Sequence, residues 1–265
     1  AQSRAVETGE TIVHPFDDPY VACGQGTAVV EMLEDITDLD VVVVPIGGGG
    51  LAAGTAVLGK HMKPDLKVVG VQSSLYPGML NALRGYERPC GGNTLAEGIA
   101  VSTPGILTRQ IVAEYVDEIV TVDEAQLETA LCLLLNAQKT LAEGAGAAGL
   151  AAIMTHRGLF RGKKVGSIIC GGNIDTRPAS GVLMRDLARS RRLARLRIEL
   201  IDVPGQLSIV SDAITRARGN IIDVAYHKIF NDLPAKQTYL DISVEATDSD
   251  HMDNIIQALR DVDLN

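Results

Sequence analysis

Four consecutive glycines, Gly47–Gly50, lie between two strongly apolar segments of the chain. The run 41–46 before them consists of valine, proline and isoleucine, and the stretch 51–58 after them is mostly alanine, leucine and valine. This pattern predicts a buried strand, a tight loop and the beginning of a helix. Because glycine has no Cβ, the loop can adopt positive φ angles and bring several backbone N–H groups against one ligand. A helix N-terminus adds unpaired donors and a favourable dipole, so we expect an anion site suited to phosphate.

The spacing of these glycines excludes the two most familiar nucleotide loops. It matches neither the dinucleotide fingerprint G-x-G-x-x-G nor the P-loop that ends in Lys-Ser/Thr. A flexible glycine linker is the remaining alternative, but linkers rarely separate two strongly apolar segments. We therefore expect a phosphate-bearing ligand other than ATP or NAD.

Composition limits the classes of protein to which the chain can belong. Its 265 residues suffice for one large domain and one small one. A net charge of −9 argues against a nucleic-acid partner. The four cysteines are widely spaced without a C-x-x-C pair, which predicts reduced, separately buried thiols and no metal site. Pro45 and the glycines interrupt the longest apolar window, and no basic-then-apolar leader opens the chain, so we expect no membrane partner and a cytoplasmic location.

Short apolar strands alternate with helices through most of the chain. Strands are expected at 39–46, 67–72, 118–122 and 164–169, and helices at 27–33, 51–62, 124–135 and 143–155. Asp123 should cap the third of these helices. The alternation indicates an α/β fold with a mostly parallel sheet and helices on both faces. Because ligands bind beyond the carboxyl ends of such strands, Gly47–Gly50 and Cys170–Asn173 are expected to meet at one site.

The composition changes in the arginine-rich stretch Arg185–Arg197. We interpret 185–194 as a solvated linker between a domain at 1–184 and another at 195–265. The second domain is expected to contain strands at 196–201, 221–230 and 237–244, and helices at 206–218 and 249–260, the last capped by Asp248 or Ser249. This β-α-β-β-α order is that of a ferredoxin-like unit whose last strand is absent or reduced to Leu264–Asn265.

Several segments together resemble threonine ammonia-lyase (threonine dehydratase). They are His14–Pro19, Gly24–Thr27, Val43–Leu51, Leu95–Val101, Ala142–Gly146 and Ser167–Asp175, and Asp202–Leu207 resembles part of an ACT regulatory domain. The segments occur in the family's order and extend over almost the whole chain. The likeness is greatest to the catabolic-type enzymes with one ACT domain. It implies a partial large domain of a fold-type II pyridoxal-phosphate enzyme, similar to the tryptophan synthase β subunit, followed by a ferredoxin-like ACT domain.

The resemblance also implies a cofactor, pyridoxal 5′-phosphate, and residues that hold it. The glycine loop and the next N–H would bind the phosphate, two glutamates and a glycine would line the ring, and a thiol would contact the pyridine nitrogen. These residues are Gly47, Gly48, Gly49, Gly50 and Leu51 for the phosphate, Glu97, Gly98 and Glu143 for the ring, and Cys170 for the nitrogen. A neutral thiol leaves that nitrogen unprotonated, which suits β-elimination of water. For Glu143, a charge paired with a helix dipole is an equally good interpretation.

In the ACT domain the resemblance implies an effector site for a small amino acid. Asp202, Gly205, Gln206 and Asn220 would contact the amino acid at an interface between two ACT domains. A homo-oligomer, formed through these domains, is therefore expected.

Two motifs of the family do not occur in these 265 residues. One is the Ser-Phe-Lys-x-Arg-Gly-Ala-like segment with the cofactor lysine, and the other is the Ser-Ala-Gly-Asn-His loop that holds the substrate carboxylate. By the resemblance an N-terminal part of the enzyme is missing, and 1–10 is a helix that would follow the substrate loop. We expect no catalytic lysine in this chain. Lys139 lies nearest a pocket motif, but nothing in the family supports it as an imine former.

Three hypotheses follow. The first is a truncated threonine ammonia-lyase, whose parent reaction converts L-threonine or L-serine to 2-oxobutanoate or pyruvate and ammonia. The second is a non-catalytic protein that binds an amino acid or dimerises through its ACT domain. The third is an altered enzyme that uses the phosphate loop without an internal imine. We favour the first.

Overall fold

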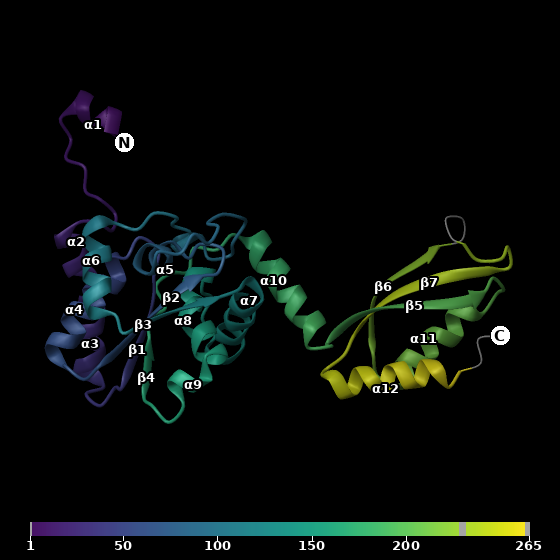
Figure 1. The fold of residues 1–265 in the computed structure, drawn as a ribbon. Helices are drawn as coiled ribbons and strands as arrows, with labels where there is room; N and C mark the ends of the chain where they lie inside the picture. Colours follow the sequence, from purple (N-terminus) through teal and green to yellow (C-terminus); the bar gives the residue numbers. More distant parts are fainter. Residues whose placement is uncertain (1, 228–231, 263–265) are drawn as a thin grey trace. The chain divides into compact units, whose positions relative to one another are not determined.

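The computed structural model describes residues 2–227 and 232–262 (Figure 1). The chain divides between Pro178 and Ala179 into two compact units, the N-terminal unit and the C-terminal unit. Each has its own hydrophobic core. The predicted limits 1–184, 185–194 and 195–265 remain predictions. Residues 185–194 include the end of one helix and the beginning of a strand.

The N-terminal unit is built on a parallel sheet with the strand order β3-β2-β1-β4. Its strands are β1 (Val41–Pro45), β2 (Lys67–Ser73), β3 (Glu118–Val122) and β4 (Val165–Ser167). Every residue of β1 and all but the first of β2 are buried, because helices cover both faces of the sheet. β4 is shorter than the predicted 164–169. Beyond Ser167 the N–H of Ile168 reaches the Val43 carbonyl only at 3.4 Å, and the strand pairing ends there.

Helices on both faces of this sheet confirm the predicted fold class. The helices of the unit are α1 (Gln2–Thr8), α2 (Pro19–Gln25), α3 (Thr27–Asp35), α4 (Gly50–Met62), α5 (Gly78–Arg84), α6 (Ile106–Tyr115), α7 (Glu124–Leu133), α8 (Gly144–Thr155) and α9 (Arg157–Phe160), and α10 (Thr176–Arg189) crosses into the C-terminal unit. α4 packs on β1 and β2 and is covered by α2, α3 and α6, whereas α8 packs on β1, β2 and β3 and is covered by α7. A 3₁₀ turn at Glu97–Ile99 and a π turn at Leu134–Gln138 complete the unit.

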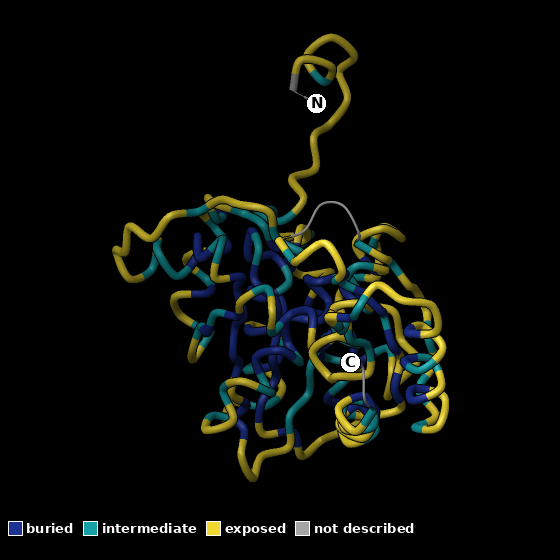
Figure 2. The backbone as a smooth tube through the Cα atoms, turned by 90° about the vertical axis from the view of Figure 1, so that its right-hand side faces the viewer, coloured by how far each residue is buried: buried dark blue, intermediate teal, exposed yellow. Residues whose placement is uncertain are grey.

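Small side chains let α8 lie very close to the sheet. Its buried residues are alanines and glycines, and a Cβ at Gly149 would overlap the hydroxyl of Ser167 on β4. Figure 2 shows the buried backbone in dark blue running through the packed interior, with the segment before α2 exposed. The sheet is therefore tightly packed, and this packing fixes the positions at which the loops leave the carboxyl ends of its strands.

The C-terminal unit contains an antiparallel sheet with the strand order β5-β7-β6. Its elements are β5 (Leu193–Ile201), α11 (Gln206–Arg216), β6 (Asn220–His227), β7 (Gln237–Glu245) and α12 (Ser249–Arg260). This is the predicted β-α-β-β-α order. The cap of α12 is Asp248, whose carboxylate accepts the N–H of His251 at 2.8 Å. Residues 228–230 of the predicted strand and Leu264–Asn265 lie outside the described residues.

The prediction of four separately buried thiols is wrong for two of them. Cys132 is buried and Cys90 is half-buried, but Cys23 and Cys170 are exposed. Cys23 lies on the outer side of the short helix α2, and Cys170 lies in the loop beyond β4, as an exposed residue whose thiol is nevertheless desolvated by neighbouring atoms. All four are free.

Two further properties hold for the part of the chain that the structure describes. None of its helices combines the length and the apolar character that crossing a membrane requires. Within residues 2–227 and 232–262, His, Cys, Asp and Glu side chains do not gather into a group that could hold a metal ion.

Candidate functional site

The glycine loop joins the carboxyl end of β1 to the N-terminus of α4. Gly49 has a φ of +104° and precedes the first residue of the helix, so it must be glycine or carry backbone strain. Among the described residues, no acceptor is found for the N–H groups of Gly47, Gly48 and Gly49. The next donors, on Gly50 and Leu51, belong to the first turn of α4 and have no acceptor within the helix. A run of adjacent N–H donors is thus available to an anion.

The loop lies beside the turn that contains Glu97 and Gly98. A Cβ at Gly47 would come within 3.2 Å of the Gly98 carbonyl oxygen and 3.0 Å of the Cα of Ile99. A Cβ at Gly98 would in turn come within 3.1 Å of Oε1 of Glu143. The structure therefore places the glycine loop, the 97–98 turn and Glu143 next to one another.

Glu143 also reaches the loop beyond β4. A Cβ at Gly171 would overlap its carboxylate, and the backbone N–H of Glu143 donates to the Gly171 carbonyl at 3.1 Å. Glu143 precedes α8, but its side chain makes no capping hydrogen bond to that helix. The carboxylate lies among Gly98, Gly171 and the backbone of Asn173. It lies near the loops that follow β1 and β4, the two strands that are paired in the sheet.

Desolvation raises the pKa of two groups at this site, which favours their neutral forms. Desolvation, followed by the nearby charge of Glu97, raises the pKa of the Glu143 carboxyl, and a hydrogen bond from the Asn173 backbone opposes the shift. Neighbouring atoms desolvate the Cys170 thiol and raise its pKa, and the charge of Glu143 raises it further. Cys170 therefore remains a thiol at neutral pH and can serve as an uncharged hydrogen-bonding partner.

The position of Lys139 gives it no role in this arrangement. It follows the π turn with a φ of +56°, and its ammonium donates to the Asn136 carbonyl at 2.9 Å in an exposed position. Within the described residues no hydrogen bond or ion pair connects its side chain to the glycine loop.

A separate hollow lies at the predicted effector turn of the C-terminal unit. It has a volume of about 460 Å³ and is lined by residues 201–207 and Tyr226. It includes Asp202, Gly205 and Gln206 but not Asn220, whose amide donates to Glu245 across the sheet. Gly205 has a φ of +98°, and among the described atoms the buried Oε1 of Gln206 has no hydrogen-bond partner.

Comparison with known proteins assigns the chain to a family. Residues 1–171 match the model of the pyridoxal-phosphate dependent enzymes, and residues 189–263 match an ACT domain. The chain belongs to the pyridoxal-phosphate dependent enzyme family. The loop fits this family's cofactor, because its unpaired N–H donors lie at a helix N-terminus without a Cβ to obstruct a phosphate ester.

Individual relatives within this family are threonine ammonia-lyases. L-threonine ammonia-lyase of Thermotoga maritima is 40% identical over 255 residues, which cover 96% of this chain and 63% of the relative. The enzyme of the same name from Geobacter sulfurreducens is 37% identical, covering 97% and 64%. The chain thus spans less than two thirds of the length of these relatives. The predicted resemblance and the predicted cofactor are confirmed for the family.

Solved structures of the family show the same fold. The T.th. threonine deaminase superposes with a TM-score of 0.62 and 35% identity, covering 66% of this chain and 59% of that one. Serine racemase from Dictyostelium discoideum superposes with a TM-score of 0.60 and 34% identity, covering 66% and 57%. The predicted fold-type II large domain is confirmed by these neighbours.

Four residues beside the glycine loop had no predicted role. Gly105 and Thr108 donate to the Gly48 carbonyl, Asp17 accepts from the beginning of α6, and the ring of Phe16 lies against Gly48. The motif His14–Pro19 contributed to the family resemblance, but no spacing in the sequence connects it to residue 108. The contacts of these four residues with the glycine loop and with α6 therefore become apparent only in the folded structure.

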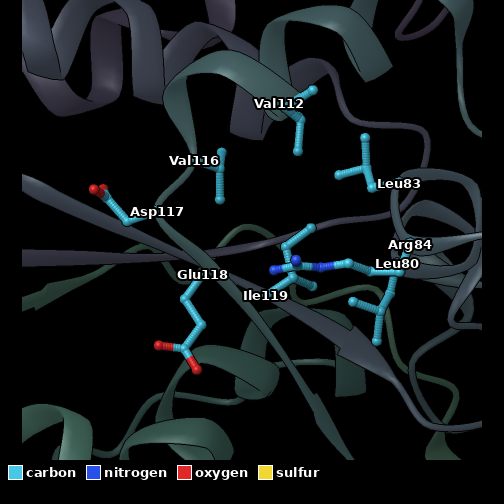
Figure 3. Close-up of a pocket in the computed structure, with 9 residues that line it drawn as sticks. Leu80, Leu83, Arg84, Val112, Val116, Asp117, Glu118 and Ile119 are labelled. Atoms are coloured by element: carbon cyan, nitrogen blue, oxygen red, sulfur yellow. The ribbon is translucent and has the colours of Figure 1, made fainter.

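Another hollow, in the N-terminal unit, lies apart from the residues that were predicted to bind the cofactor. It measures about 270 Å³ and is bounded by α5, α6 and β3 (Figure 3). Apolar and charged side chains both line it, and the guanidinium of Arg84 lies beside Ile119. Asp117 at its edge is bonded to Lys60 and to the Val68 N–H at 2.8 Å, so this acid connects elements of the fold. We assign no ligand to this hollow.

Proposed function

We propose that this chain forms the phosphate side and the ring-nitrogen side of the pyridoxal-phosphate site of a threonine ammonia-lyase, and that it carries the enzyme's ACT domain. The observation that supports this most strongly is the run of unpaired N–H donors from Gly47 to Leu51. Gly98 lies beside this run, and Glu143 lies between Gly98 and the Gly171 loop. The parent reaction is the conversion of L-threonine, and of L-serine, to 2-oxobutanoate or pyruvate with release of ammonia.

Each part of this site has a distinct task in the proposal. Pyridoxal phosphate supplies the electron sink for β-elimination when it is bound. The backbone of Gly47–Leu51 binds the phosphate, and the neutral Cys170 thiol faces the ring nitrogen. Glu97, Gly98 and Glu143 line the ring, and the raised pKa of Glu143 lets its carboxyl hold a proton nearer to neutral pH than an ordinary glutamate does.

The imine-forming lysine and the substrate loop are proposed to come from sequence outside these 265 residues. Neither motif occurs in them, and the chain spans 63% of its Thermotoga maritima relative. The non-catalytic alternative is not favoured, since the likeness to threonine ammonia-lyases covers 96% of the chain. The ACT match supports binding of a small amino acid at the hollow around Gly205. A homo-oligomer associated through ACT domains and a cytoplasmic location remain part of the proposal.

Complementation tests this function. The chain is mixed with the part of the Thermotoga maritima relative that lies outside the matched span, and pyridoxal phosphate and L-threonine are added. We expect visible absorbance from lysine-bound cofactor together with ammonia and 2-oxobutanoate. Absence of both, with the two polypeptides folded by circular dichroism, would contradict the proposal.

Borohydride reduction of the chain alone is the companion experiment. We expect no trapped lysine adduct at the site, because its lysine is proposed to lie elsewhere. A stable adduct on Lys139, located by peptide mass spectrometry, would instead show that a lysine of this chain forms the imine.

A further inference from the structure

The carbonyl of Gly48 is held by two donors from the beginning of α6. The N–H of Gly105 donates to it at 3.2 Å and the hydroxyl of Thr108 at 2.7 Å. The side chain of Thr108 is fully buried, so water does not compete for this bond. The peptide unit between Gly48 and Gly49 is planar and trans, so its C=O and N–H point in opposite directions. Anchoring the Gly48 oxygen toward α6 therefore directs the N–H of Gly49 away from α6.

Asp17 holds the beginning of α6 in place. Its Oδ2 accepts the N–H of Ile106 at 2.9 Å, and its Oδ1 accepts the N–H of Thr108 at 3.1 Å. Gly105 occupies the cap position of α6 and has no side chain with which to satisfy these donors. A Cβ at Gly105 would overlap the Asp17 carboxylate. A residue remote in sequence thus caps α6 and fixes the backbone that carries Thr108.

Phe16 supports the loop from another side. Its ring lies so close to Gly48 that a Cβ there would overlap it, and its carbonyl oxygen would be 3.0 Å from a Cβ at Gly50. The Thr108 hydroxyl likewise would be 2.9 Å from a Cβ at Gly49. Contacts from Phe16 and from α6 therefore restrict the loop, so that its N–H groups cannot easily turn toward α6.

We propose that Thr108 is a positioning residue for the phosphate loop, and that Asp17 keeps Thr108 in register with Gly48. The inference rests on the proposed function, because the anion toward which Thr108 would orient the loop is the phosphate of the cofactor. Thr108 does not touch the phosphate itself. It acts through the Gly48–Gly49 peptide, whose N–H it turns toward the anion.

The test compares phosphate-bearing and phosphate-free ligands on the full chain. Pyridoxamine 5′-phosphate and pyridoxamine are titrated calorimetrically, since neither can form an imine with a lysine. Thr108→Val removes the hydroxyl at nearly constant volume. We expect it to weaken pyridoxamine 5′-phosphate binding by about tenfold, the equivalent of one buried hydrogen bond. Pyridoxamine binding should not change.

Matched variants separate positioning from general damage. Thr108→Ser keeps the hydroxyl and should restore affinity to within about twofold of the wild type. Thr129→Val removes another helical hydroxyl, one that donates to Ala125 on the exposed side of α7, and should leave both ligands unaffected. Asp17→Asn provides an independent variant if Thr108→Val does not fold, and should selectively weaken the phosphate-bearing ligand by about threefold.

The outcomes are distinguishable. If the wild type does not bind pyridoxamine 5′-phosphate, the proposed cofactor site itself fails, and the positioning role fails with it. If the wild type binds but Thr108→Val and Asp17→Asn bind equally well, only the positioning role is overturned. Equal weakening of both ligands would also overturn it, because a purely structural threonine predicts that result.

Discussion

Asp17 accepts a hydrogen bond from the backbone N–H of Thr108 at 3.1 Å, although 91 positions separate the two residues. This bond connects the segment before α2 to the beginning of α6. Desolvation acts to raise the pKa of Asp17, but hydrogen bonds from the N–H groups of Thr108, Ile106 and Leu107 outweigh it and lower the pKa. The ionised carboxylate is therefore the form that stabilises the fold.

The first prediction concerns the pH dependence of this bond. A lowered pKa in the folded state gives stability that is present above the unfolded pKa, near pH 4, and is lost as the pH falls below it. Asp17→Asn should lower the free energy of unfolding by about 1 kcal/mol at pH 7, and by less as the pH falls through about 4. Urea denaturation at several pH values measures this difference. Asp35→Asn, an exposed aspartate at the end of α3, is the control and should change little. A loss that is the same at every pH would contradict the assignment.

The second prediction concerns Gly48 and the ring of Phe16. Gly48→Ala introduces a methyl group into the space of that ring and should cost about 1–3 kcal/mol of folding free energy. The cost should be smaller in a Phe16→Ala background, because the ring is then gone. Gly24→Ala on the exposed side of α2 meets nothing within 4 Å. It should stabilise the protein by about 0.5–1 kcal/mol, since alanine is the better helix former.

Thermal and urea unfolding of the two single variants and the double variant give the coupling between Gly48 and Phe16. Additive effects of Gly48→Ala and Phe16→Ala would show that the ring does not lie against the loop. They would also remove one support for a rigid phosphate site.

The elements nearest the site could be predicted from local sequence. The valine run and the glycines mark where β1 ends and α4 begins, and Pro64 marks where α4 ends. Each of these signals is local, because it depends only on the residues at that boundary. Asp123 is the cap that the sequence predicts, and it forms a capping box with Gln126. Short-range apolar periodicity and capping chemistry suffice for such features.

Other features depend on contacts between distant segments. Nothing near Thr108 in the sequence indicates a bond to Gly48, and nothing in the 14–19 motif indicates a cap for α6. The shortness of β4 and the exposure of Cys170 depend on where the sheet pairing ends, which an apolar run alone does not specify. The family resemblance groups Asn220 with the effector turn, but here its amide is bonded to Glu245.

The third prediction uses the raised pKa of Glu143. Desolvation, then the charge of Glu97, raises it, so the folded state binds a proton more readily than the unfolded chain. Stability is therefore lost as the pH rises from the unfolded pKa through the folded one. Glu143→Gln keeps the acceptor for the Asn173 backbone and removes the charge. It should stabilise the protein by up to about 1 kcal/mol at pH 7 and have little effect near pH 4. Glu114→Gln, which removes a carboxylate on α6, is the control for charge removal. Equal gains for both variants would contradict a specific role for the site.

The fourth prediction concerns Asp241 in the C-terminal unit. Its side chain is 2% exposed beneath two arginines, and Arg197 holds it with two bonds, Nε to Oδ1 at 2.7 Å and a terminal nitrogen to Oδ2 at 2.8 Å. Arg195 donates at 3.1 Å, and His227 lies 3.2 Å from Oδ2. The hydrogen bond from Arg197 is the main reason that the pKa of Asp241 falls to about 2.

The sign of the resulting pH effect follows from this lowered pKa. The stability contributed by Asp241 is complete above about pH 4 and is lost as the pH falls toward about 2. Asp241→Asn should destabilise the C-terminal unit by about 1–2 kcal/mol at pH 7, a modest value because the arginines remain largely exposed to solvent. Amide hydrogen exchange along β7 in the full chain measures the loss locally. Asp223→Asn, an exposed aspartate on β6, is the matched control and should leave exchange unchanged. Between about pH 4 and pH 2 the wild type should lose the extra β7 protection that it has over Asp241→Asn. If this difference in protection stayed the same over that range, the ion pairs of Asp241 with the arginines would not be what stabilises this sheet.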